Sequence, residues 1–265
     1  MVRLMRADFY RIFRGKAIYV TFVLMIIYLL LQVNAHNTGT NVGIHFTVED
    51  GIENIASATL TGVVAAQMIL HSINELVFFL LPLMIAVAMA AFSSGAVKNE
   101  LSTGLSRPLF CLSKWLTSAI LCTAFMLVYV LGAVAIGIAS GGVGDLSHGV
   151  LSTILSAFGM QLLFVLAFNS LGIFLCLVTR KSAVVTAVFV AFAMAPPMLA
   201  ALLHGVFPTF VEEYIYYDLW IQFTLFAQMA NRSAVDIARG LAVGLGYAAL
   251  LLAAGIALFK RAEIK

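Results

Sequence analysis

Six long apolar stretches constrain this chain more than any other feature. They cover residues 17–33, 76–93, 115–139, 150–178, 183–203 and 237–259. A helix of about 20 apolar residues rises roughly 30 Å, which matches the hydrocarbon core of a bilayer. The whole chain is 63% hydrophobic and only 10% charged, whereas soluble domains carry roughly 25% charged residues. We therefore predict an all-α membrane protein of one domain, residues 1–265, with about six transmembrane helices.

The basic residues predict the orientation of these spans. If the six stretches cross the membrane, all fifteen Lys and Arg residues fall on one side except Arg232 and Arg239. Most of the Asp and Glu residues fall on the other side. Cytoplasmic segments carry an excess of Lys and Arg. We therefore expect a multi-pass protein of the cell membrane with both termini in the cytoplasm.

The two large outer segments, 34–75 and 204–236, are not plainly hydrophilic. Residues 55–70 are apolar but are interrupted by Ser57, Thr59, Thr61 and Gln67. A seventh span there would reverse the sorting of basic residues, so we expect an interfacial helix. The second segment is rich in aromatic residues, which favour the headgroup zone. It predicts a re-entrant or interfacial helical hairpin, with a simple aromatic belt as the alternative. In the fifth span, the adjacent Pro196 and Pro197 predict a kink or a break.

The N-terminal segment, residues 1–16, predicts a basic amphipathic helix. On a helical wheel one face is apolar and the other carries arginines. The apolar face comprises Val2, Met5, Phe9, Ile12 and Phe13, and the basic face comprises Arg3, Arg11 and Arg14. Such a helix lies on the inner leaflet. It could brace a cytoplasmic partner, or it could serve only as an anchor.

The segment between the second and third spans, residues 94–114, has a short apolar stripe. Val97, Leu101 and Leu105 are spaced at i, i+4 and i+8, and polar residues surround them. Gly104 offers a turn and Pro108 discourages further helix. The pattern predicts a short amphipathic helix suited to docking in a groove of a partner. An ordinary interfacial loop is the alternative.

These two cytoplasmic features resemble those of type-2 ABC transporter permeases. The resemblance lies in SSGAVKNELSTGLSRP, residues 93–108, in Lys114 at the next span, and in MRADFYRIFRGK, residues 5–16. The six-span layout fits as well, although Gly95 and Ala96 stand where many members have an acidic residue followed by Gly-Thr. The resemblance implies a permease that dimerises or pairs with a sister permease. A separate cytoplasmic ATPase subunit, holding ATP and Mg²⁺, would dock on it.

The resemblance also implies which residues couple the permease to the ATPase. In the docking loop these are Val97, Lys98, Asn99, Glu100, Leu101, Gly104, Leu105, Ser106 and Arg107. In the N-terminal elbow helix they are Met5, Phe9, Arg11, Ile12, Phe13 and Arg14.

Other sequence features argue against chemistry in this chain. The only Gly-Lys pair, Gly15-Lys16, lacks the rest of a phosphate-binding loop, so we expect no bound nucleotide. The five histidines lack the paired spacing of a metal site, and the three cysteines suggest no disulfide framework. A net charge of +3 is too small to argue for nucleic acid.

The family resemblance therefore predicts a non-catalytic subunit of an exporter. Its substrate would be amphiphilic, such as a peptide, a drug or a lipid, and antimicrobial-peptide resistance is a typical role. A secondary transporter working alone is the first alternative, although few ionisable residues lie deep in the expected spans. An intramembrane hydrolase is the second, but neither Ser170 nor Ser182 has an organised partner in the sequence.

Overall fold

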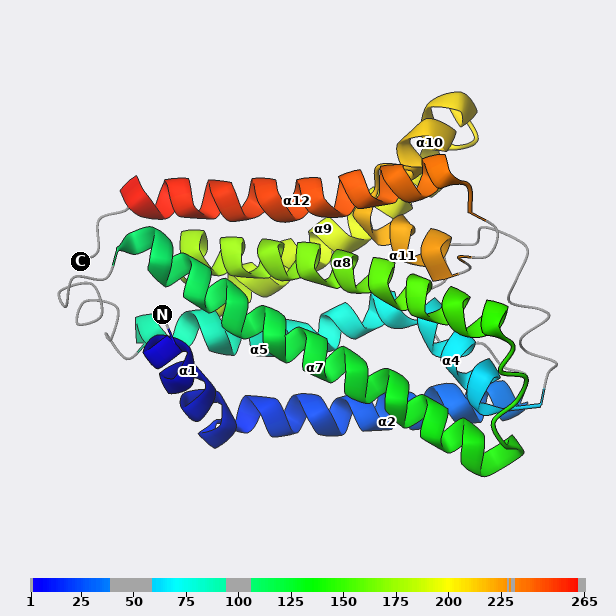
Figure 1. Ribbon diagram of the computed structural model, residues 1–265. Helices are drawn as coiled ribbons and strands as arrows, with labels where there is room; N and C mark the ends of the chain where they lie inside the picture. The colour runs from blue at the N-terminus through cyan, green and yellow to red at the C-terminus, as the bar shows by residue number, and fades with distance from the viewer. Residues whose placement is uncertain (1, 39–58, 94–105, 228, 230–231, 262–265) are drawn as a thin grey trace.

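The computed structural model describes residues 2–38, 59–93, 106–227, 229 and 232–261 (Figure 1). Six helices are long and apolar enough to cross a membrane, and no strand occurs in the described residues. The prediction of an all-α membrane protein with about six spans is confirmed. The spans are α2 (Lys16–Thr38), α5 (Ile73–Ser93), α7 (Arg107–Gly141), α8 (His148–Thr179), α9 (Ser182–Leu203) and α12 (Ala234–Arg261). The shorter helices are α1 (Val2–Arg14), α4 (Gly62–His71), α10 (Pro208–Ile215) and α11 (Leu219–Ala227).

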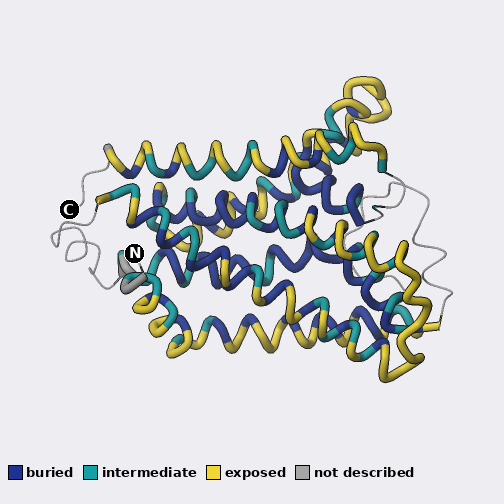
Figure 2. Tube along the Cα trace, in the orientation of Figure 1, coloured by how far each residue is buried: buried dark blue, intermediate teal, exposed yellow. Residues whose placement is uncertain are grey.

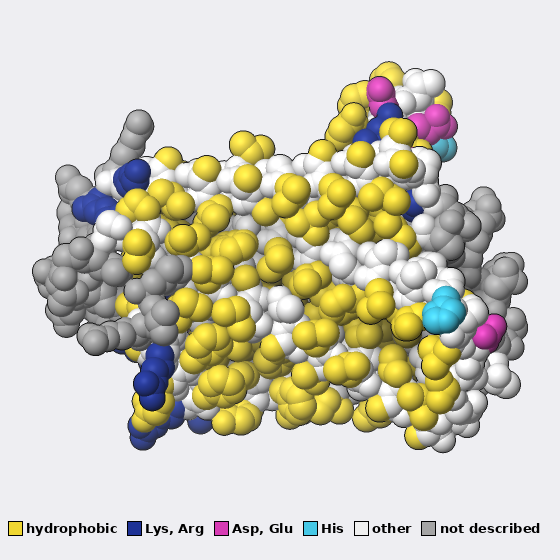
Figure 3. Space-filling model, in the orientation of Figure 1, with side chains coloured by type: hydrophobic (Ala, Val, Ile, Leu, Met, Phe, Trp, Pro, Cys, Tyr) yellow, Lys and Arg dark blue, Asp and Glu magenta, His cyan; other side chains and the backbone are white. Residues whose placement is uncertain are grey.

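The spans alternate in direction, so α1 and the end of α12 lie at the same end of the bundle (Figure 1). We call this the terminal end, and the other the opposite end. Figure 3 shows Lys and Arg side chains gathered at the terminal end of the visible face. Acidic side chains on that face lie at the opposite end (Figure 3). This distribution agrees with the predicted sorting of charge along the bundle axis.

Helix α8 forms the centre of the bundle and packs against α5, α7, α9, α11 and α12. In its most apolar window 67% of residues are buried, against 17% in α12. The outward faces of α2 and α12 are largely exposed (Figure 2). Between their polar ends, the large side chains exposed on these helices are apolar, such as Val23, Leu31 and Leu250. A water-facing surface would not carry such side chains along the whole helix, and lipid accounts for them.

Helix α4 is the described part of the segment expected to lie along the membrane surface. It is 10 residues long, too short to span, and it packs on the half of α7 that lies at the opposite end. Gly137 and Gly141 of α7 make this contact possible, because an added Cβ would lie 2.5 Å and 2.6 Å from the carbonyl oxygens of Thr61 and Leu60. The face of α4 that meets α7 is buried in the bundle, which distinguishes α4 from a helix resting on the lipid surface.

Helices α10 and α11 form the hairpin that the aromatic outer segment predicted. Helix α10 projects beyond the bundle, and α11 turns back into it (Figure 1). Asp218 starts α11 by accepting a hydrogen bond from Ile221 N at 2.8 Å. Trp220 and Phe223 pack against Phe168 of α8, with ring centroids 6.3 Å and 5.9 Å apart. At nine residues, α11 enters the bundle without crossing it.

Two expected boundaries differ in the structure. Helix α9 runs without interruption through Pro196 and Pro197, so the chain does not break there. Helix α7 begins at Arg107, so residues 107–114 belong to the span rather than to the loop. Pro108 lies in its first turn, where no backbone donor is needed, and so it starts a helix.

Candidate coupling site at the terminal end

Helix α1 lies against the bundle through one face, as its amphipathic sequence predicts. Ile12 is buried, and Leu4, Met5 and Phe9 are half-buried. Arg6, Arg11 and Arg14 face outward. Phe13 was expected on the inner face, but it is 54% exposed. The position that completes the buried face is Asp8, which is 2% exposed.

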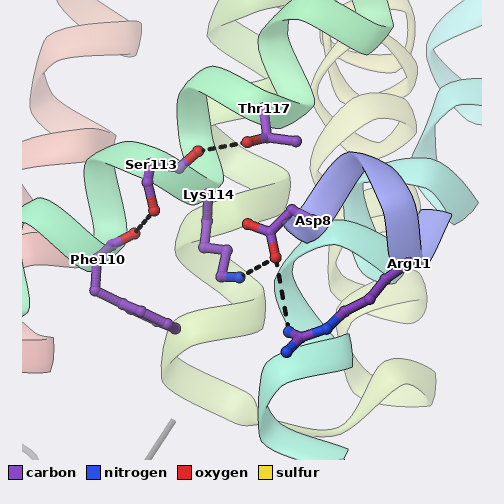
Figure 4. A network of polar contacts seen from close by, with 6 residues as sticks. All are labelled: Asp8, Arg11, Phe110, Ser113, Lys114 and Thr117. Atoms are coloured by element: carbon purple, nitrogen blue, oxygen red, sulfur yellow. Dashed lines mark hydrogen bonds and ion pairs between the residues drawn. The ribbon is translucent and has the colours of Figure 1, made fainter. Parts of the chain in front are cut away.

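Asp8 is buried because it pairs with Lys114 of α7. Lys114 Nζ donates to Asp8 Oδ1 at 2.6 Å, and the lysine side chain is 0% exposed (Figure 4). The same ammonium lies 5.1 Å from the centroid of the Phe110 ring. Arg11 Nη1 lies 3.8 Å from the same carboxylate oxygen. The pair therefore joins residues 106 positions apart and fixes α1 to the start of α7.

A buried ion pair of this kind is sensitive to the loss of either partner. Removing two charges from water is costly, and their mutual attraction compensates only while both are present. Asp8 Oδ2 has no hydrogen-bond partner among the described residues. The ammonium of Lys114, at 2.6 Å, is therefore the closest charged partner of this carboxylate, and Arg11 is more distant at 3.8 Å. This makes the junction of α1 and α7 a point where a small displacement has a large energetic effect.

Arg107 joins the start of α7 to the end of α12. Its Nη1 donates to the carbonyl oxygen of Lys260 at 2.6 Å and lies 3.4 Å from that of Phe259. The last carbonyls of a helix lack partners within the helix, and a cation there also favours the helix dipole. The arginine therefore supports the C-terminal end of α12.

An aromatic cluster packs beneath Arg107. Phe110 of α7 stacks on Phe259 of α12 with centroids 5.5 Å apart. Phe92 of α5 meets both rings edge-on at 6.2 Å. Arg180, which follows α8, lies 5.6 Å above the Phe92 ring. Four spans are thus held together at the terminal end, where α5 ends and α7 begins on either side of residues 94–105 in the sequence.

The coupling residues predicted in the docking loop divide into two groups. Ser106 and Arg107 are described, at the start of α7, whereas Val97, Lys98, Asn99, Glu100, Leu101, Gly104 and Leu105 lie outside the described residues. The structure adds Asp8, Phe92 and Phe110, none of which the sequence singled out. An acidic residue on the apolar face of an amphipathic helix was the available signal for Asp8.

A second polar cluster lies within the bundle, towards the opposite end. Tyr28 of α2 donates to the carboxylate of Glu75 in α5, and Gln32 Nε2 donates to the Tyr28 hydroxyl at 2.5 Å. Glu75 is 7% exposed. It lies in the first turn of α5, at the end of the segment 34–75 that the sequence predicts to be outside. Helix α4 precedes Glu75 in the chain and contacts α5.

Of the two serines considered as nucleophiles, Ser170 has hydrogen-bond partners that hold helices together. Ser170 Oγ accepts a hydrogen bond from Trp115 Nε1 at 2.8 Å and donates to the Leu166 carbonyl at 3.0 Å. Its neighbour Asn169 accepts from Ser118 Oγ at 2.5 Å. These contacts join α7 to α8 and include no general base. Among the described residues, no group of three or more His, Cys, Asp or Glu could hold a metal ion.

Comparison with known proteins adds no family to these observations. No protein-family model matches the chain, and no curated protein is similar to it at a significant level.

Proposed function

We propose that this chain is the permease subunit of an ATP-driven exporter, with its terminal end facing the cytoplasm. The observation that carries the proposal is the buried Asp8–Lys114 pair, which anchors α1 to α7. Helix α7, which carries Lys114, begins two positions after residues 94–105, the predicted docking segment. The family resemblance of both segments agrees with this arrangement.

The contacts at the terminal end suggest how a partner could act on the spans. A separate ATPase subunit, holding ATP and Mg²⁺, would bind α1 and the docking segment. Its movement would reach α7 through Lys114 and Arg107, and α12 through Phe259. Packed cores respond to such displacement by moving as units, because they do not deform continuously. The spans would then rock and release an amphiphilic substrate from the opposite side.

A second permease chain, as a homodimer partner or a sister subunit, would complete the transport pathway. The exposed apolar faces of α2 and α12 are available to lipid or to such a chain (Figure 2). The proposed substrates are peptides, drugs or lipids, since such molecules can leave laterally from the bilayer. Export of antimicrobial peptides for resistance is the role that the resemblance favours.

The proposal is tested by isolating the chain from its native membrane, identifying any ATPase subunit that co-purifies with it, and reconstituting the two in vesicles. Transport and ATP hydrolysis should both require the assembled complex. Arg107→Glu, Lys98→Glu and Leu101→Asp should uncouple hydrolysis from transport while the spans remain folded. Lys181→Glu is the matched control, because Lys181 is exposed at the terminal end but lies in another loop. Unchanged ATPase binding and transport in the first three variants would remove the coupling assignment.

A secondary transporter is the second candidate, and Glu75 favours it. Ion-coupled carriers keep ionisable groups inside the membrane, and Glu75 is a buried carboxylate in the first turn of α5, bonded to Tyr28. In this case the pure chain would move substrate on an ion gradient without any ATPase, and Glu75→Gln would abolish that activity. If transport by the complex depends on ATP and survives Glu75→Gln, the secondary-transporter candidate is rejected.

A further inference from the structure

A cavity of about 490 Å³ opens at the opposite end, between α10, the end of α11 and the start of α12. Its lining includes Glu212 and Glu213 from α10 and two arginines, Arg232 and Arg239. Tyr216 also borders it. Figure 3 shows basic and acidic side chains side by side where α10 projects from the bundle. Arg232 and Arg239 are also the two exceptions to the sorting of basic residues along the chain.

The four charged groups share the cavity without pairing with one another. In the described part of the chain, none of them forms an ion pair with another within 4.0 Å. Arg232 Nε instead donates to the Leu225 carbonyl at 2.7 Å. The Arg239 guanidinium lies 5.4 Å from the centroid of the Tyr216 ring. These two contacts are with neutral groups, and Asp236 is a nearby carboxylate that interacts electrostatically with both guanidiniums. No printed contact ties either guanidinium to Glu212 or Glu213, so both can still face a ligand in the cavity.

A lining of two carboxylates and two guanidiniums complements a ligand that carries both signs of charge. Guanidinium groups bind phosphate oxygens in a planar, often bidentate geometry. Carboxylates accept hydrogen bonds from an ammonium group. A purely anionic ligand would be repelled by Glu212 and Glu213, and a purely cationic one by the arginines. A phosphate ester that also bears an ammonium group satisfies both pairs.

The surroundings of the cavity favour a phospholipid as the source of that headgroup. The cavity lies at the opposite end of the spans, and with six membrane-spanning helices such an end would meet a layer of headgroups. On its other face α10 borders a second cavity of about 400 Å³. This second cavity is lined by apolar and aromatic residues, including Leu199 and Leu203 of the span α9. Acyl chains can therefore lie on apolar surface next to the headgroup site.

We propose that this cavity binds the headgroup of a zwitterionic phospholipid, with its phosphate at Arg232 and Arg239 and its ammonium at Glu212 and Glu213. The inference needs only the membrane location of the chain, so it is independent of the proposed export function.

Native mass spectrometry of the full chain, released from detergent with added lipid, tests this proposal. The probes are phosphatidylethanolamine and phosphatidylglycerol with identical acyl chains. The wild type should bind phosphatidylethanolamine more tightly. Glu212→Gln combined with Glu213→Gln should lower this binding to the level of phosphatidylglycerol. Arg239→Gln should weaken binding of both lipids roughly tenfold, as expected for one charge-assisted contact. Asp145→Asn and Arg14→Gln are matched controls at exposed sites away from the cavity, and they should change nothing.

Three outcomes would overturn the proposal. Equal binding of the two lipids by the wild type would remove the zwitterion preference. Unchanged binding in folded glutamate and arginine variants would remove the site. A soluble probe, glycerophosphoethanolamine, distinguishes a lipid site from a site for small solutes. If it competes as strongly as the intact lipid does, the assignment to a phospholipid fails.

Discussion

Lys114 illustrates how a single position acquires its role from a partner far away in the chain. In sequence it is one of several basic residues at the expected membrane boundary. In the structure it is enclosed by α7, by Asp8 and by the Phe110 ring (Figure 4). The same is true of Glu75, whose neighbours in sequence do not reveal the Tyr28 hydroxyl.

The Asp8–Lys114 pair yields a prediction about stability. Lys114→Met leaves the Asp8 carboxylate buried without its partner, so we expect a loss of about 3–5 kcal/mol of stability. Combining it with Asp8→Leu should restore much of the loss, since no isolated charge remains. Arg11→Gln is the control, because Arg11 lies 3.8 Å away and is partly exposed, and it should have a small effect. Thermal unfolding in detergent measures these three variants and the single variant Asp8→Leu. Additive losses in the double variant would contradict the pairing.

Asp218 predicts a dependence of stability on pH. Burial raises the pKa of its carboxyl group above the ordinary value, although the hydrogen bonds from Ile221 N and the Tyr214 hydroxyl oppose this. The folded chain therefore holds this proton more tightly than the unfolded chain does. The stabilisation is complete at low pH and is lost as the pH rises through the folded pKa.

Asp218→Asn should remove this dependence, because asparagine also starts a helix but does not ionise. Between about pH 4 and pH 7, the wild type should lose stability relative to Asp218→Asn. Asp145→Asn, at an exposed site, serves as the reference. Parallel unfolding temperatures for wild type and Asp218→Asn across this range would show that Asp218 does not titrate differently on folding.

At the scale of elements, α4 depends on glycines in another helix. The first backbone amides of α4 donate hydrogen bonds to carbonyl oxygens of the residues that follow α7. The Gly62 amide donates to the Gly142 carbonyl at 2.9 Å. The close approach leaves no room for a side chain at Gly137 or Gly141. Neither apolar content nor period predicts this packing, because α4 and the end of α7 are each apolar on several faces.

Gly137→Ala should therefore destabilise the protein. The added Cβ would lie 2.5 Å from the Thr61 carbonyl oxygen, a backbone atom that cannot rotate away. We expect a loss of about 1–3 kcal/mol, typical of overpacking. Gly149→Ala in α8 is the control, because a Cβ there meets nothing within 4 Å. Equal unfolding temperatures for the two variants would contradict the close contact.

At the scale of the whole molecule, the six spans place α1 and the end of α12 at one end of the bundle. The bias of basic residues predicts that this end is cytoplasmic. Cysteine labelling tests the orientation, since the native Cys111, Cys122 and Cys176 are all buried. In intact cells, a membrane-impermeant maleimide should label Asp145→Cys and Glu212→Cys. It should label Arg14→Cys only after the cells are opened. The reverse pattern would invert the topology and with it the proposed direction of export.

The sequence by itself determined the number of spans, their approximate bounds, the amphipathic α1 and the aromatic hairpin before α12. These follow from hydrophobic length, helical period and composition, which are properties of short stretches of chain. Only the tertiary structure decided that α4 folds inward, that α9 continues through Pro196 and Pro197, and that α7 begins at Arg107. Only the tertiary structure shows the contact of Asp8 with Lys114, 106 positions apart, and of Tyr28 with Glu75, 47 positions apart. Such pairs depend on how helices pack together, and almost any packing of six apolar helices satisfies the same hydrophobic pattern.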